Sequence, residues 1–434
     1  MQRLGINAIR VYNLDPEVDH NLCASIFNAV GIYMLLDVNS PLPNESLDSS
    51  APWNSYNVAY LNRTFAVVEA FKNYPNTLLF FAGNEVISDL PTGGIDPPYV
   101  RVSRRIVLRT FYCKLYSISS DFERDIILMF TKAVTRDLKN YISKHSSRQI
   151  GVGYSAADVR PLLLDTWNYF QCSTTGDTND TSRVDLFALN SYSWCNGDNI
   201  QTSTYDVLAS DFANTSVPVF LSEYGCNRVT PRTFDEVQAI YGPVMTPSFS
   251  GGIVYEYSEE VNNYGLVVLN SNGSAQLRQD FDNLQGQFNQ LNFTSLEGTK
   301  STNGSVVPPV CTANLITNAG FSTNFTIPEP PPGAQVVIDD GLTNPNIGNL
   351  VSVTDLRVSQ TVQQTNGAVI SGLAIKPLPD DQSNSPSGLN DSATPSTTVS
   401  AAPSATTTKN AATRTFVMDT SASLVVLLAT LWCL

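Results

Sequence analysis

Basic residues are scarce in this chain. Its 434 residues include 25 Lys and Arg against 39 Asp and Glu, which gives a formal net charge of −14 at pH 7. A surface of this sign repels polyanions, so the composition argues against nucleic acid as a partner and suits a secreted protein that handles an uncharged substrate.

Histidine is scarcer still, and several catalytic motifs are missing. The two histidines, His20 and His145, fall in segments expected to be helical and show no metal-ligand spacing, so we expect no metal site. The chain has no phosphate-binding P-loop, no Ser-His-Asp order and no Gly-x-Gly-x-x-Gly turn after a strand. We therefore expect no cofactor.

The N-terminus lacks the pattern of a signal peptide. The opening "MQRLGINAIRVYNLD" has no basic start followed by an apolar stretch. The chain nevertheless indicates the secretory pathway, where disulfides form, because it combines a Ser/Thr-rich tail with many glycosylation sequons. We therefore expect the sequence to lack its original beginning. The sequons are at Asn44, Asn62, Asn179, Asn214, Asn272, Asn292, Asn303, Asn324 and Asn390.

The apolar C-terminus is too short for a membrane-spanning helix. Ser421 to Leu434 gives 14 residues, whereas a spanning helix needs about 20. Small residues at Asn410 to Ala412 and a polar spacer precede this run, which is the order of a GPI-attachment signal. We expect a GPI lipid anchor at Asn410. A short membrane anchor is the alternative.

What the chain does contain is an alternation of apolar strand-like runs and helical patterns. Helical spacing occurs in 57–74, 133–145 and 233–242. Near-continuous apolar strands between helices predict a parallel α/β sheet covered on both faces. We predict a (β/α)8 TIM barrel lacking its first strand in this chain, with an open doubly wound sheet as the alternative. The seven strand candidates are 6–12, 32–38, 77–85, 149–155, 184–192, 217–225 and 251–258.

Composition divides the chain into four parts. We expect residues 1–310 to form the barrel and residues 311–375 a small C-terminal extension with a β-like pattern. A disordered Ser/Thr/Pro-rich stalk follows over 376–410. We expect residues 411–434 to be the GPI-attachment propeptide.

Residues 102–132 do not fit this organisation. They hold six of the 25 basic residues and show no clear helical or strand period. The codons for Val102-Ser103 can match a splice donor, and the codon for Lys132 can match an acceptor. We interpret the segment as a retained intron, with a real loop insertion as the alternative; the transcript sequence across this junction distinguishes the two.

Two strand candidates end in a glutamate, Glu85 in "FFAGNE" and Glu223 in "VPVFLSE". The carboxyl ends of parallel barrel strands open onto one face, so we expect the two side chains to converge there. Carboxylates about 5 Å apart act as acid/base and nucleophile in retaining glycosidases. Asn84 would donate to the sugar 2-hydroxyl. A lone glutamate would more often form a salt bridge, but the pair favours catalysis.

Polar aromatic residues gather at the same strand ends. Rings with hydroxyl groups offer sugars an apolar face and a hydrogen-bonding tip, so together they predict a carbohydrate cleft. Arg10 and Asp37 are further candidates, either for binding or as charge partners that orient the glutamates. The aromatic candidates are Tyr12, Tyr192, Trp194, Tyr224, Tyr255 and Tyr257.

Ordered sequence blocks resemble one known family. "LGINAIRVYNLDP", "LLDVNSP", "FFAGNEV", "VGYSAADVR", "NSYSWC", "FLSEYGCN" and "GGIVYEYSEE" are similar to blocks of the fungal β-1,3-glucanosyltransferases of glycoside hydrolase family 72. These are GPI-anchored proteins of the outer membrane leaflet and cell wall that elongate and remodel β-1,3-glucan. The resemblance implies that Glu85 is the general acid/base and Glu223 the nucleophile. It also implies that glucan donor and acceptor subsites are lined by Tyr12, Asp37, Tyr192 and Tyr255.

The resemblance also implies disulfides and a reaction. Cys195 would pair with Cys226 and Cys172 with Cys311, while Cys23 would be left without a partner. The expected activity is retaining transglycosylation, in which an acceptor sugar takes the place of water. A β-1,3-glucan hydrolase and a non-catalytic glucan-binding wall protein are the alternatives.

Overall fold

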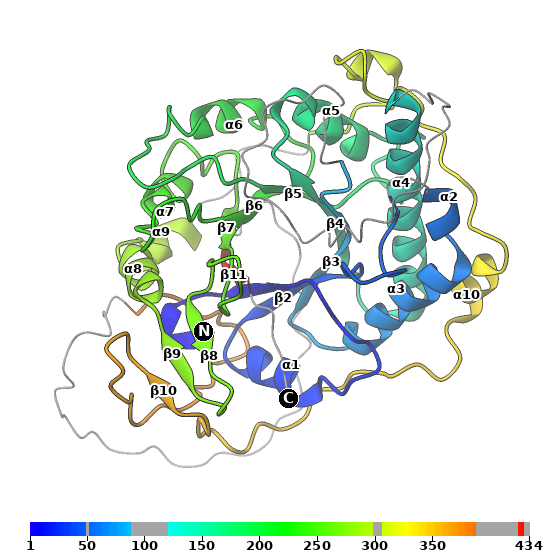
Figure 1. Ribbon diagram of the computed structural model, residues 1–434. Helices are drawn as coiled ribbons and strands as arrows, with labels where there is room; N and C mark the ends of the chain where they lie inside the picture. Colours follow the sequence, from blue (N-terminus) through cyan, green and yellow to red (C-terminus); the bar gives the residue numbers. More distant parts are fainter. Residues whose placement is uncertain (49–51, 88–119, 298–305, 388–423, 429–434) are drawn as a thin grey trace, which may run out of the picture.

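The protein, seen in a computed structural model, is described over residues 1–48, 52–87, 120–297, 306–387 and 424–428. Parallel strands form a barrel surrounded by helices (Figure 1), which confirms the predicted TIM-barrel architecture. All seven predicted strands are present. They are β1 (Ala8–Val11), β2 (Tyr33–Asp37), β3 (Thr77–Asn84), β4 (Gly151–Ala157), β5 (Leu186–Asn190), β6 (Val219–Tyr224) and β7 (Gly251–Val254).

An eighth strand closes the barrel at the position that we expected to be vacant. This strand, β11 (Leu424–Leu428), runs parallel to both β1 and β7. Val426 pairs with Ala8 on one side and with Ile253 on the other. The closed order is β1-β11-β7-β6-β5-β4-β3-β2. Strand β11 lies within 411–434, the segment predicted to be the GPI propeptide.

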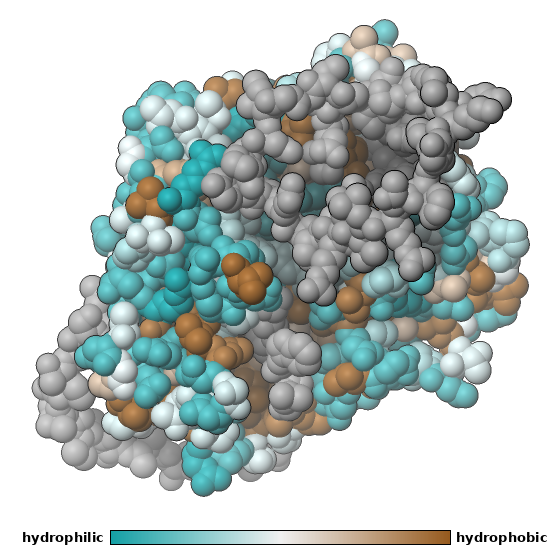
Figure 2. Space-filling model, viewed as in Figure 1, coloured by the Kyte–Doolittle hydropathy of each residue, from teal (hydrophilic) through white to brown (hydrophobic). Residues whose placement is uncertain are grey.

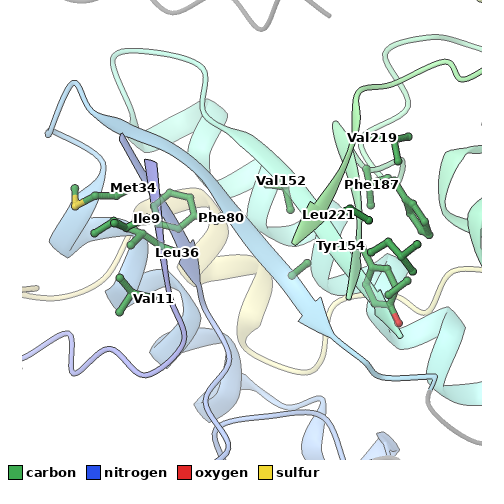
Figure 3. Close-up of a cluster of buried hydrophobic side chains, with 14 of the residues drawn as sticks. Ile9, Val11, Met34, Leu36, Phe80, Val152, Tyr154, Phe187, Val219 and Leu221 are labelled. Carbon is green, nitrogen blue, oxygen red and sulfur yellow. The ribbon is translucent and has the colours of Figure 1, made fainter. Parts of the chain in front are cut away.

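Successive strand residues face opposite sides of the barrel wall. Ala8, Leu35 and Phe81 belong to a small cluster inside the barrel. Their neighbours Ile9, Met34 and Phe80 belong to the larger layer of buried side chains between strands and helices, part of which Figure 3 shows. Because the facing direction alternates with each residue, Arg10 and Asp37 share the interior side with Ala8 and Leu35.

Two helices show how local sequence sets their limits. In α3 (Val58–Phe71), the Asn57 side chain caps the first turn by accepting a hydrogen bond from the backbone N–H of Tyr60. Helix α4 (Ser120–His145) begins inside 102–132, where the sequence showed no clear period. Its apolar face runs at a spacing of four through Phe130, Val134 and Leu138. The rest of that segment lies outside the described residues.

The other helices lie mainly around the barrel (Figure 1). They are α1 (Asn21–Ala29), α2 (Pro52–Ser55), α5 (Arg160–Gln171), α6 (Tyr205–Asp211), α7 (Glu236–Ile240), α8 (Gln279–Phe288) and α9 (Phe293–Glu297). Hydrophobic residues are interspersed with hydrophilic ones on the face seen in Figure 2. Within the described ranges, no helix has both the length and the apolar character needed to cross a membrane.

The C-terminal extension packs onto the barrel. Helix α10 (Ala334–Asp340) contacts α3 and α4. Strand β10 (Val362–Gln363) joins a three-stranded sheet whose other members, β8 (Val267–Leu269) and β9 (Ala275–Leu277), follow β7. The segment 311–375 therefore contributes the short strand β10 to a sheet whose other two strands belong to residues 1–310.

The start of the predicted stalk also lies against the barrel. The side-chain amide of Asn384 donates to the backbone carbonyls of Gln2 and Ile6. Asn384 is buried, and the backbone N–H of Leu378 donates to the carbonyl of Ala29. Residues 376–387 therefore pack where composition alone predicted a disordered spacer.

Disulfides link Cys172 to Cys311 and Cys195 to Cys226, as the resemblance implies. The first ties the extension to the end of α5, and the second joins the loops that follow β5 and β6. Cys23 is itself disulfide-bonded, which corrects the expectation that it has no partner.

A buried arginine fixes the loops that follow β6 and β7. Arg232 is 1% exposed and forms an ion pair with Asp280 at 2.7 Å. Its guanidinium also donates to the carbonyls of Gly225 (3.1 Å), Tyr255 (2.7 Å) and Tyr264. One side chain thus joins three segments near the barrel mouth.

Asp280→Asn is expected to lower the free energy of unfolding by about 3 to 5 kcal/mol, because it leaves a buried guanidinium without its counter-charge. Denaturant unfolding measures the change. The matched control is Asp355→Asn, which breaks an exposed pair with Arg357 and should leave the midpoint unchanged. Equal effects of the two substitutions would show that burial does not govern the Arg232 pair.

Candidate active site

The predicted site residues that the structure describes collect at the carboxyl ends of the strands. Asp37 ends β2, Asn84 ends β3 and Glu85 follows it directly. Glu223 is the penultimate residue of β6. Tyr12, Tyr192 and Tyr255 follow β1, β5 and β7 within two residues. Asn410, the predicted lipid-attachment residue, lies outside the described residues.

Arg10 holds the centre of the site and is completely buried. Its Nε and Nη2 atoms donate to the two carboxylate oxygens of Asp37 at 2.8 and 2.9 Å. Nη2 also donates to Asn84 Oδ1 at 2.8 Å, and Nη1 lies 3.5 Å from Glu223 Oε1. Because the guanidinium is planar and held at both edges, Asp37 supports the site through Arg10. A direct role of Asp37 in a sugar subsite stays a prediction.

Glu223 is surrounded by hydrogen-bond donors. The hydroxyl groups of Tyr12 and Tyr192 donate to its two oxygens at 2.5 and 2.6 Å, beside the contact from Arg10. Burial and the nearby Glu223 charge raise the pKa of both tyrosines well above the ordinary value, so the hydroxyls stay protonated. Three donors stabilise the ionised form of the Glu223 carboxylate.

Glu85 lies in a different environment. Its backbone has a φ of 49°, the left-handed region that non-glycine residues rarely adopt. Its backbone N–H donates to the carbonyl of Ser155 at 2.8 Å. Its Oε1 accepts a hydrogen bond from Asn190 Nδ2 at 2.9 Å. Burial raises the pKa of Glu85, while the Asn190 bond and the Arg10 charge lower it to a smaller extent.

The two carboxyl groups influence each other's protonation. Burial, followed by the charge of Glu85, raises the pKa of Glu223 to about 7, against the lowering effects of Arg10, Tyr12 and Tyr192. Among the described residues, Glu223 receives three hydrogen-bond donors and Glu85 receives one. This contrast in donors favours a proton on Glu85 and a negative charge on Glu223.

Tyrosine rings form a wall beside Glu223. The ring of Tyr255 meets those of Tyr12 and Tyr192 edge to face, with centroids 6.4 and 6.3 Å apart. Tyr264, which the sequence did not single out, lies 5.2 Å from Tyr255 and 5.6 Å from Tyr192. Two other aromatic candidates belong to the hydrophobic core, because Tyr224 is fully buried and Trp194 is 6% exposed.

Sequence reasoning missed three polar residues that hold the site together. Asn190, Ser155 and Ser222 are all buried, and both serine hydroxyl groups contact Asn190 Oδ1 and lie 2.8 Å from each other. Asn190 and Ser155 each end an apolar run, in "VDLFALN" and "IGVGYS". The criterion that identified Glu85, a polar residue at the end of a buried strand, would have found both. Within the part of the chain that the structure describes, no group of His, Cys, Asp and Glu could hold a metal ion.

Comparisons with known proteins agree with this geometry. The profile of the family described as Glucanosyltransferase matches residues 1–128 and 117–292. The 1,3-beta-glucanosyltransferase gel2 of Aspergillus fumigatus is 48% identical over 386 residues, which cover 89% of this chain and 74% of gel2. The probable 1,3-beta-glucanosyltransferase GAS3 of Saccharomyces cerevisiae is 42% identical, over 84% of this chain and 65% of GAS3.

A solved structure is similar as well. A mutant of Saccharomyces cerevisiae Gas2p in complex with laminaritetraose and laminaripentaose aligns with a TM-score of 0.61 and 31% identity, over 77% of this chain and 65% of that chain. The fold, the paired carboxyl groups and the two sequence relatives point the same way. The chain belongs to the glucanosyltransferase family.

Proposed function

We propose that this protein is a retaining 1,3-β-glucanosyltransferase. It cleaves an internal β-1,3-glucan linkage and transfers the new reducing end to a second glucan chain, in fungal cell-wall assembly and remodelling. The observation that carries this proposal is a contrast within the described part of the chain, where Glu223 has three hydrogen-bond donors and Glu85 has one. The names of the relatives and the laminari-oligosaccharides bound to Gas2p support the substrate class.

The reaction has two displacements. In the first, Glu223 attacks the anomeric carbon, the glycosidic C–O bond breaks, and Glu85 gives its proton to the departing oxygen. In the second, Glu85 takes the proton of an acceptor hydroxyl, whose oxygen attacks the same carbon and releases Glu223. Two inversions retain the β configuration. An acceptor sugar in place of water makes the product longer.

The length of the products separates transfer from hydrolysis. The protein is incubated with one laminari-oligosaccharide, and the products are resolved by chromatography. Transfer yields oligosaccharides both longer and shorter than the substrate. Products that are only shorter would support the hydrolase alternative. Glucan binding without any turnover would support the non-catalytic wall protein.

We also propose a GPI anchor at Asn410 that places the protein on the outer leaflet of the cell membrane, with access to the wall. Small residues, a polar spacer and an apolar end in this order support it. Attachment there would remove 411–434, including β11, so one molecule cannot use the segment both ways. Phospholipase release and mass spectrometry of the C-terminal peptide test the anchor. A peptide ending at Leu434 would contradict it.

A further inference from the structure

We propose that Asn190 is the positioning residue of the general acid/base. Its side-chain amide determines which oxygen of Glu85 carries the proton and turns the amide of Asn84 toward the sugar. This inference rests on the proposed function, because it takes Glu85 as the acid.

The oxygen side of the Asn190 amide is fixed by donors. Asn190 ends β5, between β4 and β6, and is 3% exposed. Its Oδ1 accepts from the hydroxyl groups of Ser155 at 3.0 Å and Ser222 at 2.7 Å. Nη1 of Arg10 lies 3.4 Å from the same oxygen. Ser155 and Ser222 are fully buried, so water cannot replace these contacts.

The nitrogen side of the amide faces the catalytic residues. Asn190 Nδ2 donates to Glu85 Oε1 at 2.9 Å and to Asn84 Oδ1 at 3.1 Å. A flipped amide would place its oxygen against Asn84 Oδ1, which accepts from Arg10, and its N–H groups beside the guanidinium of Arg10. These contacts favour the orientation in which the N–H groups of Asn190 point at Glu85 and Asn84.

This orientation has a consequence for each partner. Because Glu85 Oε1 accepts from Asn190, the proton of the acid form belongs on Oε2, which leaves one oxygen to serve the departing and arriving hydroxyl groups. Asn84 Oδ1 accepts from both Asn190 and Arg10. The NH2 group of Asn84 is thereby turned to the opposite side, where it can donate to a sugar hydroxyl.

Two donor substrates test whether Asn190 acts through Glu85. A laminari-oligosaccharide needs protonation of its leaving oxygen, whereas a laminarioligosyl β-fluoride releases fluoride without a general acid. For Asn190→Ala, kcat/KM should fall about 100-fold with the oligosaccharide, the lower range for general acid catalysis. With the fluoride, the first step should fall clearly less, because it needs little help from the acid and loses only the contribution of Asn84.

The pH profile supplies a second readout. Removal of the Asn190 donor raises the pKa of Glu85, since that bond lowers it. The alkaline limb of kcat/KM with the oligosaccharide should therefore move upward by about one pH unit. Asn190→Asp keeps the shape of the side chain and places a carboxylate beside Glu85, so it should move the alkaline limb of kcat/KM in the same direction. This variant replaces Asn190→Ala in the test if Asn190→Ala does not fold.

The control is Asn199→Ala, an exposed asparagine in the loop that follows β5, which should retain wild-type rates with both donors. Equal losses with both donors and an unmoved alkaline limb would show that Asn190 is only structural and would overturn this inference alone. A wild-type protein that turns over neither donor would overturn the proposed function and this inference with it.

Discussion

Glu223→Gln is expected to abolish both transfer and hydrolysis, with kcat falling at least about 10⁴-fold, as expected when a catalytic nucleophile is removed. An amide of nearly the same size cannot form the glycosyl-enzyme. The hydroxyl groups of Tyr12 and Tyr192 still meet a polar group in the same place, so the fold should be kept. Chromatography of laminari-oligosaccharide products measures the loss.

Two comparisons make this result interpretable. Glu17→Gln changes an exposed glutamate in the loop after β1 and should leave activity unchanged. Glucan pull-down with Glu223→Gln should match the wild type, because the tyrosine wall is intact. Residual turnover above about 1% of the wild-type rate would assign the nucleophile to another group.

Glu85→Ala is expected to lose about 10³-fold in kcat with a laminari-oligosaccharide, since both steps lose their proton transfer. A laminarioligosyl β-fluoride should restore the first step alone. The glycosyl-enzyme then accumulates, because no base activates the acceptor, and intact-mass spectrometry should detect it. Added azide needs no base and should release a β-glycosyl azide.

The matched variant Glu259→Gln tests the specificity of that rescue. Glu259 lies on the loop after β7 and forms an ion pair with Arg278, which directly precedes α8. Its substitution should produce neither an accumulating adduct nor an azide product. Absence of both signals from Glu85→Ala, in a protein that is folded and binds glucan, would remove Glu85 from the role of acid/base.

The strands could be predicted because each is a nearly continuous apolar run. Alternation along a strand also places Arg10 and Asp37 inside the barrel, two residues from Ala8 and Leu35. Alternation alone gives the wrong side for Glu223. This residue lies two and four positions after Leu221 and Val219, which face the helices, so strict alternation would point its side chain to the helices as well. The β6–β7 register shifts between Leu221 and Tyr224, and this turns Glu223 inward with Ser222. Such shifts depend on neighbouring strands, so one strand's sequence does not reveal them.

Long-range contacts were also beyond the sequence patterns. The apolar residues of β11 fit a GPI signal and a buried parallel strand equally well, because both need an uncharged apolar run. The packing of Asn384 depends on carbonyls at the other end of the chain. The interpretation of 102–132 as a retained intron stays a prediction, and α4 crosses its predicted end at Lys132 without a break.

The most direct test of the two-step reaction is to trap the intermediate on the wild-type protein. A 2-deoxy-2-fluoro laminarioligosyl β-fluoride forms the glycosyl-enzyme but slows its breakdown, since the fluorine removes the contacts that the 2-hydroxyl makes in the transition state. Peptide mapping by mass spectrometry then locates the sugar. We expect one adduct, on the peptide that carries Glu223. A sugar attached to Asp37, or active protein that forms no adduct, would contradict the assignment.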